Sequence, residues 1–145
     1  MHDASPMIVD LLQSALRQAG RAVSAELAVA DLTLDQWRVL RALEGDAGWT
    51  MGEVAEAAQL TAPTATRVVD ALVDRGLAYR HAPASDRRQV VVVLAAAGGK
   101  LVARLDAVVR EAERRALQTL GIESPRELRD LLMPVQERIG TGSQP

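Results

Sequence analysis

Three charged residues, Asp86, Arg87 and Arg88, lie next to one another between two segments of high β-propensity, residues 77–82 and 89–94. The segments predict a β-hairpin, and the proline and small polar residues between them predict its loop. Arginines at such a tip can bind phosphates or enter a minor groove, whose negative potential attracts them. We expect Asp86 to orient Arg88 for this role through a charge-assisted bond, with Arg87 as a neighbouring phosphate contact. A solvated polar loop is the alternative.

A second group of candidate contacts lies just before the hairpin. Apolar spacing predicts a short helix over residues 51–58 and a longer one over residues 62–75, which ends at Gly76. Two helices joined by so short a turn are typical of a helix-turn-helix, whose second helix enters the major groove of DNA. The candidate contacts at the start of that second helix are small or hydroxyl-bearing residues and one arginine: Thr61, Ala62, Pro63, Thr64, Thr66 and Arg67.

The side chains of this longer helix suit a DNA-binding surface, with one objection. Hydroxyl groups can bond phosphates, and an arginine such as Arg67 can pair bidentately with guanine. Asp70 and Asp74 lie on the same helix, however, and would repel phosphates if they faced DNA. An ordinary amphipathic helix with a solvated face is therefore the alternative.

The charge of the chain is distributed unevenly. The 145 residues carry a net charge of −2, which argues against binding nucleic acid through charge alone. Residues 61–88 nevertheless hold five arginines against three aspartates. Positive charge is thus concentrated in the two segments that carry the candidate contacts.

Composition and motifs argue against several other classes of protein. The absence of cysteine excludes disulfides, thiol nucleophiles and thiolate metal sites, and two histidines make a poor zinc site. We find no phosphate-binding loop and no plausible Ser/His/Asp set, so we expect no enzymatic activity, no cofactor and no metal. The N-terminus does not resemble a signal peptide and no apolar run is long enough to span a membrane, so we expect a cytoplasmic protein without a membrane partner.

The two ends of the chain predict long amphipathic helices. Apolar residues recur at spacings of three and four over residues 8–30 and 101–139. Ser5-Pro6 predicts the start of the first helix, and Gly98-Gly99 predicts the end of the hairpin and therefore the start of the next helix. Phenylalanine is absent, so the core must consist mostly of Ala, Val and Leu, and dimerisation would add buried area. An intramolecular bundle is the alternative.

Local signals predict the starts of the helices between these ends. Thr33 with Gln36, and Thr50 with Glu53, have the spacing of a capping box, in which each side chain bonds the other residue's backbone N–H. Thr61 predicts a side-chain cap for the helix over residues 62–75.

Three stretches of the chain carry a resemblance to a known family. They are LTLDQWRVL (32–40), TAPTATRVVDAL (61–72), and DRR (86–88) running into Val93-Leu94 and Gly98. With these residues the chain resembles, over essentially its whole length, the MarR family of bacterial winged helix-turn-helix transcription regulators. One departure is Ala95, where the family usually has a threonine that would cap the next helix.

The resemblance implies a mainly α fold with a small β-hairpin wing, in a single regulator domain over residues 1–145. A winged helix-turn-helix part over residues 33–97 would be flanked by dimerisation helices over residues 5–31 and 99–140. The resemblance further implies a homodimer that binds a pseudo-palindromic operator in double-stranded DNA. We expect a repressor that a small, often aromatic or phenolic, effector releases.

Three residues of the second predicted helix are candidates for the effector pocket: Trp37, Arg38 and Arg41. They would supply an aromatic wall and cations for an anion. The alternative places Trp37 in the core and the two arginines on the surface or against phosphates. A rival function is a protein-interaction module that uses the winged helix to dock a partner, without sequence-specific DNA binding.

Overall fold

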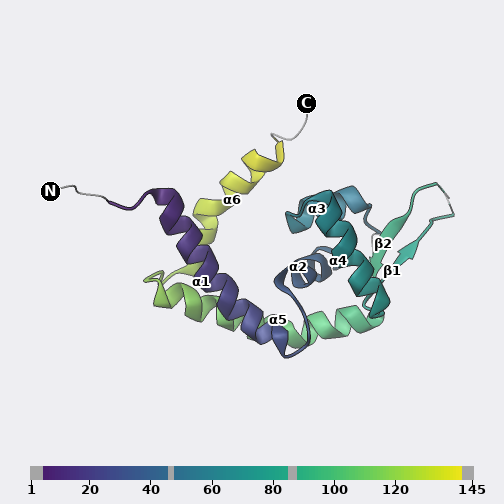
Figure 1. Ribbon diagram of the computed structural model, residues 1–145, viewed down its shortest axis with the longest axis horizontal. Coiled ribbons are helices and arrows are strands. Elements are labelled where there is room, and N and C mark those ends of the chain that lie inside the picture. Colours follow the sequence, from purple (N-terminus) through teal and green to yellow (C-terminus); the bar gives the residue numbers. More distant parts are fainter. Residues whose placement is uncertain (1–4, 46–47, 85–87, 142–145) are drawn as a thin grey trace. The chain divides into compact units, whose positions relative to one another are not determined.

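The computed structural model describes residues 5–45, 48–84 and 88–141. The elements are α1 (Ile8–Ala28), α2 (Leu34–Ala42), α3 (Met51–Ala58), α4 (Ala62–Asp74), β1 (Ala78–His81), β2 (Val91–Leu94), α5 (Ala96–Thr119) and α6 (Pro125–Thr141) (Figure 1). This order of four helices, a hairpin and two helices confirms the predicted fold class.

The chain divides into two compact units, each with its own packing. The first unit, residues 27–107, contains α2, α3, α4, the hairpin and the first half of α5. The second contains α1 up to residue 26 and the chain from residue 108 onward. The candidate DNA contacts all belong to the first unit.

The two predicted capping boxes are confirmed. The Thr33 hydroxyl accepts a bond of 3.1 Å from the Gln36 N–H, and the Gln36 side chain accepts one of 3.0 Å from the Thr33 N–H. Thr50 and Glu53 form the same reciprocal pair at the start of α3. These caps fix where α2 and α3 begin and satisfy backbone N–H groups that a helix leaves unpaired.

The start of α1 differs from the prediction. The Met7 carbonyl accepts bonds from the N–H groups of Asp10 and Leu11, at 3.0 and 3.2 Å. Met7 therefore occupies the N-cap position, and the start predicted at Ser5-Pro6 was wrong by two residues.

The start of α5 also differs, because Gly98 and Gly99 lie inside its first turns instead of ending the sheet. A Cβ atom on Gly98 would lie 2.2 Å from the Leu77 carbonyl oxygen, which also accepts a 3.0 Å bond from the Ala95 N–H. Glycine is therefore needed here for close packing against the Leu77 backbone just before β1, and not as a helix breaker. The two glycines do mark a special position in the chain, but the prediction that they end the sheet was wrong.

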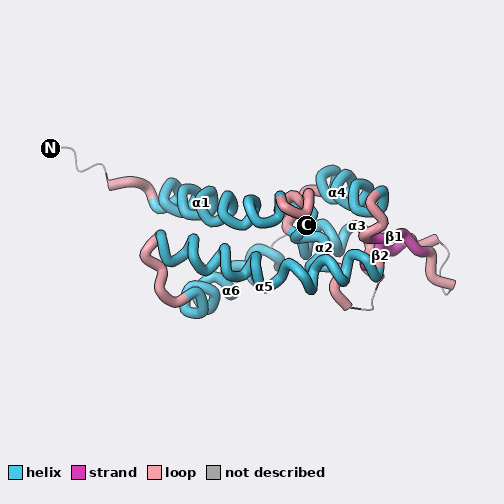
Figure 2. The backbone as a smooth tube through the Cα atoms, turned by 90° about the horizontal axis from the view of Figure 1, so that it is seen from below, coloured by secondary structure: helices cyan, strands magenta, loops and turns pink. Residues whose placement is uncertain are grey.

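The hairpin is shorter than the predicted strands. Its antiparallel register pairs Ala78 with Leu94 at one end and His81 with Val91 at the other. Trp49 adds a bridge to Val92, with backbone bonds of 2.9 and 2.7 Å in the two directions. The hairpin projects from the helices of its unit (Figures 1 and 2).

The core of the first unit consists mostly of aliphatic side chains, drawn from every element, as its composition predicts. Its largest fully buried members are Leu27, Val39, Leu40, Leu43, Val54, Val69, Leu72, Val92 and Val102. Ala65, Val69 and Leu72 of α4 are 0% exposed, so one whole side of this helix faces the core. Because 3.6 residues make a turn, the opposite side must face outward.

The second unit leaves many large apolar side chains in solvent. On α1 these include Ile8, Leu12 and Leu16, at 74%, 59% and 64% exposure, and Leu131 of α6 is 73% exposed. A groove of about 600 Å³ runs between α1, α5 and α6 and is lined mostly by apolar residues. A soluble chain rarely exposes so much apolar surface unless a partner covers it.

The contact between Gly98 and Leu77 can be tested with a matched pair of substitutions. We expect Gly98→Ala to lower the free energy of unfolding by about 1–3 kcal/mol, because the new methyl group meets a backbone oxygen. Gly99→Ala is the control, since its Cβ would meet Leu94 at an ordinary 3.9 Å; it should be neutral or stabilise the helix by up to about 1 kcal/mol. Urea unfolding measures both, and equal effects of the two variants would contradict the packing argument.

Candidate nucleic-acid interface

The exposed side of α4 carries the predicted contacts of the helix-turn-helix. Thr61, Ala62, Pro63, Thr66 and Arg67 are exposed and Thr64 is half-buried, all within the N-terminal half of the helix. All six residues are therefore at least partly accessible at the N-terminal end of α4. Burial of Ala65, Val69 and Leu72 on the other side fixes which residues point outward.

The threonines of this surface bond one another and the backbone. The Thr61 hydroxyl donates to the Thr64 hydroxyl at 2.9 Å and makes no bond to a backbone N–H, so the predicted side-chain cap was wrong. The Thr66 hydroxyl donates to the Ala62 carbonyl at 3.0 Å. A hydroxyl has one donor, so Thr64 keeps its own O–H for an acceptor such as a phosphate, whereas Thr66 would have to rotate.

The arginines near α4 fall into two groups. Arg67 is exposed, and within the described residues its side chain makes no ion pair or hydrogen bond. Arg75 instead donates to the carbonyls of Asp31 and Ala30, at 2.6 and 3.1 Å, and so holds the chain that leaves α1. Arg75 was grouped by its position in the sequence with the candidate DNA-binding charge, but its bonds are structural.

Arg80 forms an ion pair that sequence analysis missed. Its Nη2 atom lies 2.6 Å from Oδ1 of Asp70, so the pair joins β1 to α4. The two residues are ten positions apart in different elements, and no local pattern predicts their contact. The objection that Asp70 would repel phosphates is thereby weakened, because a guanidinium offsets its charge.

The hairpin tip is described in part. Asp86 and Arg87 lie outside the described residues, so the expected orientation of Arg88 by Asp86 stays a prediction. Arg88 itself is exposed, on the segment that leads into β2.

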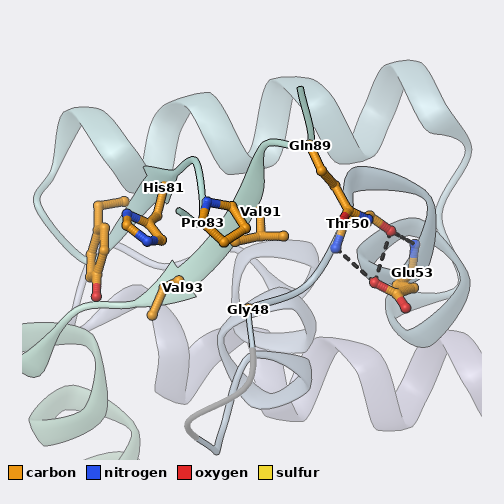
Figure 3. Close-up of a pocket in the computed structure, with 9 residues that line it drawn as sticks. Gly48, Thr50, Glu53, His81, Pro83, Gln89, Val91 and Val93 are labelled. Atoms are coloured by element: carbon orange, nitrogen blue, oxygen red, sulfur yellow. Dashed lines mark hydrogen bonds between the residues drawn. The ribbon is translucent and has the colours of Figure 1, made fainter. Parts of the chain in front are cut away.

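A groove of about 450 Å³ lies on the side of the hairpin that carries Tyr79 and His81 (Figure 3). Its lining is Gly48, Thr50, Glu53, Tyr79, His81, Pro83, Gln89, Val91 and Val93. The Glu53 carboxylate accepts bonds of 2.8 Å from both the N–H and the hydroxyl of Thr50, and these bonds lower the pKa of Glu53. Glu53 therefore serves the start of α3, although it borders an open surface.

The three effector candidates occupy different environments on α2. Trp37 is 7% exposed and belongs to the core. Arg38 is exposed and pairs with Asp35 at 3.2 Å. Arg41 pairs with Asp106 at 2.5 Å and with Glu44 at 3.2 Å, which ties α2 to α5. Both cations are thus occupied by acidic side chains of the protein itself.

Within residues 5–45, 48–84 and 88–141, no cluster of three or more described His, Asp or Glu side chains could hold a metal ion. None of the helices formed by these residues is both long and apolar enough to span a membrane.

Comparison with known proteins connects this arrangement to one family. Residues 30–89 match the model of the MarR family. The transcriptional repressor Rv2887 of Mycobacterium tuberculosis is 34% identical over 119 residues, which span 82% of this chain and 83% of that protein. The homoprotocatechuate degradative operon repressor of Escherichia coli is 27% identical over 133 residues, or 91% and 87% of the two chains. The crystal structure of Rv2887 in complex with salicylic acid superposes with a TM-score of 0.69 at 30% identity, covering 94% of this chain and 98% of that one.

The capping box of α3 makes a prediction about pH. Because the pKa of Glu53 is lowered in the folded state, its carboxylate stabilises the fold at pH values above the unfolded-state pKa. This stabilisation is lost as the pH falls through the lowered, folded-state pKa. Thr50→Val removes the hydroxyl donor and should raise the pKa of Glu53 toward its usual range. A carbon-13 NMR titration of the Glu53 carboxyl in both proteins measures this, and an unchanged titration would contradict the assigned cause.

Proposed function

Because the chain belongs to the MarR family of transcription regulators, we propose that it is a homodimeric repressor that binds a pseudo-palindromic operator and is released by a small aromatic effector. The observation that carries the proposal is the exposed side of α4. It presents hydroxyl groups and Arg67 on a helix whose other side is buried, next to a projecting hairpin.

In this proposal α4 enters the major groove. Arg67 pairs with a base edge, since its guanidinium is exposed and suits guanine. Thr64 donates its hydroxyl to a phosphate. The hairpin reaches the adjacent minor groove or its phosphates through Arg88, with Asp86 as the orienting partner and Arg87 as a further phosphate contact.

The exposed apolar side chains of the second unit support a homodimer. A second copy of the chain would cover Ile8, Leu12 and Leu16 of α1 together with Leu131 and Leu132 of α6. Such a two-fold contact uses the same surface on both copies. It would relate two α4 helices by the same axis, so we expect half-sites about one helical turn apart.

A small aromatic carboxylate is the proposed effector class. The relative Rv2887 was crystallised with salicylic acid, and the related E. coli repressor is named for an operon that degrades an aromatic compound. Arg38 and Arg41 are candidate partners for the carboxylate, and Trp37 for the ring. A carboxylate that binds Arg41 would share its guanidinium with Asp106 and Glu44 or displace one of them.

Selection of duplexes from a random pool tests the DNA-binding proposal. We expect the wild-type protein to enrich a pseudo-palindrome, here named the selected duplex. Arg67→Ala and Arg88→Ala should each weaken binding to it by about 1–3 kcal/mol. Arg67→Ala should also relax the preference at one base position. Fluorescence anisotropy measures binding, and sedimentation should find the same dimer in both variants.

Arg104→Ala is the matched control, because Arg104 is exposed on α5 and lies outside both candidate elements. Its affinity should stay close to that of the wild type. Wild-type affinity in Arg88→Ala would refute the role of the hairpin. A selection that enriches no sequence would favour the protein-interaction module instead.

The effector proposal is tested with salicylate. We expect salicylate to raise the melting temperature of the wild type and to release the selected duplex. At salicylate concentrations above Kd, the rise in melting temperature should grow with the logarithm of the salicylate concentration. Arg38→Ala should reduce this shift at little cost to stability, because its pair with Asp35 is exposed and worth under about 1 kcal/mol. Salicylamide, which has no carboxylate, is the ligand control. Equal shifts in wild type, Arg38→Ala and Arg41→Ala would exclude both arginines as partners of the carboxylate.

A further inference from the structure

The ion pair between Asp70 and Arg80 lies between the two elements proposed to contact DNA. The Arg80 side chain is 36% exposed and that of Asp70 is 54% exposed, so the pair lies at the surface. It is also the contact by which a charged side chain of β1 reaches α4.

The alternation of side chains along β1 determines where Arg80 points. Its neighbours Tyr79 and His81 line the groove on one side of the hairpin (Figure 3). Arg80 therefore extends from the other side, toward α4, as its bond to Asp70 shows. A guanidinium has five N–H donors, and its bond to Asp70 occupies one of them. Because the side chain is partly exposed, the remaining donors are available to a ligand.

Asp70 has a counterpart that makes its role testable. Asp74 lies one turn farther along α4 and is also exposed, but its side chain has no ion pair or hydrogen bond to any residue that the structure describes. Both carboxylates add negative charge to the helix that approaches DNA. On charge alone, both should weaken DNA binding to a similar extent.

We propose that Asp70 is a positioning residue, which holds the Arg80 guanidinium between α4 and the hairpin so that its remaining N–H groups bind a DNA phosphate. The inference rests on the proposed DNA-binding function and adds a contact to it. On charge alone, removal of the negative charge of Asp70 should strengthen DNA binding. The proposal predicts the opposite, because without Asp70 the Arg80 guanidinium loses its orientation and specific binding weakens.

The experiment compares Asp70→Asn with Asp74→Asn on the selected duplex and on a scrambled duplex, over a range of salt concentrations. Asp70→Asn should weaken binding to the selected duplex about fivefold or more and lower the slope of log K against log salt by about 1, the signature of one lost phosphate contact. Asp74→Asn should bind equally well or more tightly, with an unchanged slope. Asp70→Glu, which keeps the carboxylate, should restore most of the affinity.

A double-mutant cycle separates positioning from independent effects. Arg80→Gln should weaken binding as much as Asp70→Asn, and the double variant should lose little more than either single variant. Melting temperatures of all variants verify that the hairpin remains folded.

Three results would overturn the inference. Asp70→Asn could behave like Asp74→Asn, which would leave only the effect of charge. It could weaken binding with an unchanged salt slope and a lower melting temperature, which would make the pair a structural brace. If the wild type itself binds the selected and the scrambled duplex equally well, the proposed function fails. The wild-type measurement on the two duplexes therefore separates this outcome from the other two.

Discussion

The backbone at Leu77 is the point on which the arrangement of the first unit depends. Its N–H donates to the Leu72 carbonyl at the end of α4, and its carbonyl accepts from Ala95 just before α5. Gly98 packs against the same carbonyl, at a distance that leaves no room for a side chain. One peptide segment therefore joins the end of α4, the hairpin and the start of α5. The hairpin consequently has a fixed base, and the angle at which it leaves α4 is set by backbone contacts rather than by its exposed tip.

The chain has a net charge of −2, so binding to DNA would depend on where its few cations lie. The arginines near α4 are divided between structure and the candidate interface. Arg75 is occupied by backbone carbonyls, Arg80 uses one of its donors for Asp70, and Arg67 is exposed with its donors available. Affinity for DNA would then depend on a few placed guanidinium groups and not on a broad field. Such an interface gains specificity, because each contact requires its phosphate or base at one position.

The sequence predicts features whose partners lie within one helical turn. The capping boxes at Thr33 and Thr50 are correct because both partners are three residues apart. The exposed side of α4 follows from helical periodicity, which also places Arg67. Contacts over longer separations were missed: Gly98 approaches a carbonyl 21 residues earlier in the chain, and Arg80 pairs with Asp70 in another element. Composition and periodicity carry no information about such pairs, so the glycine was misread and the aspartate was taken as an objection.

Contacts between distant residues also hold the chain near the two places where it leaves the first unit. The boundaries between the two units fall between residues 26 and 27 and between residues 107 and 108. Just after the first boundary, Arg75 donates to the carbonyls of Ala30 and Asp31. Just before the second, Asp106 pairs with Arg41. Arg75 at the C-terminal end of α4 and Arg41 of α2 thus each hold the chain near one boundary. If the proposed effector displaces Asp106 from Arg41, the free energy of that bond is subtracted from the affinity for the effector. If the effector then weakens DNA binding, linkage requires that DNA weaken effector binding by the same factor.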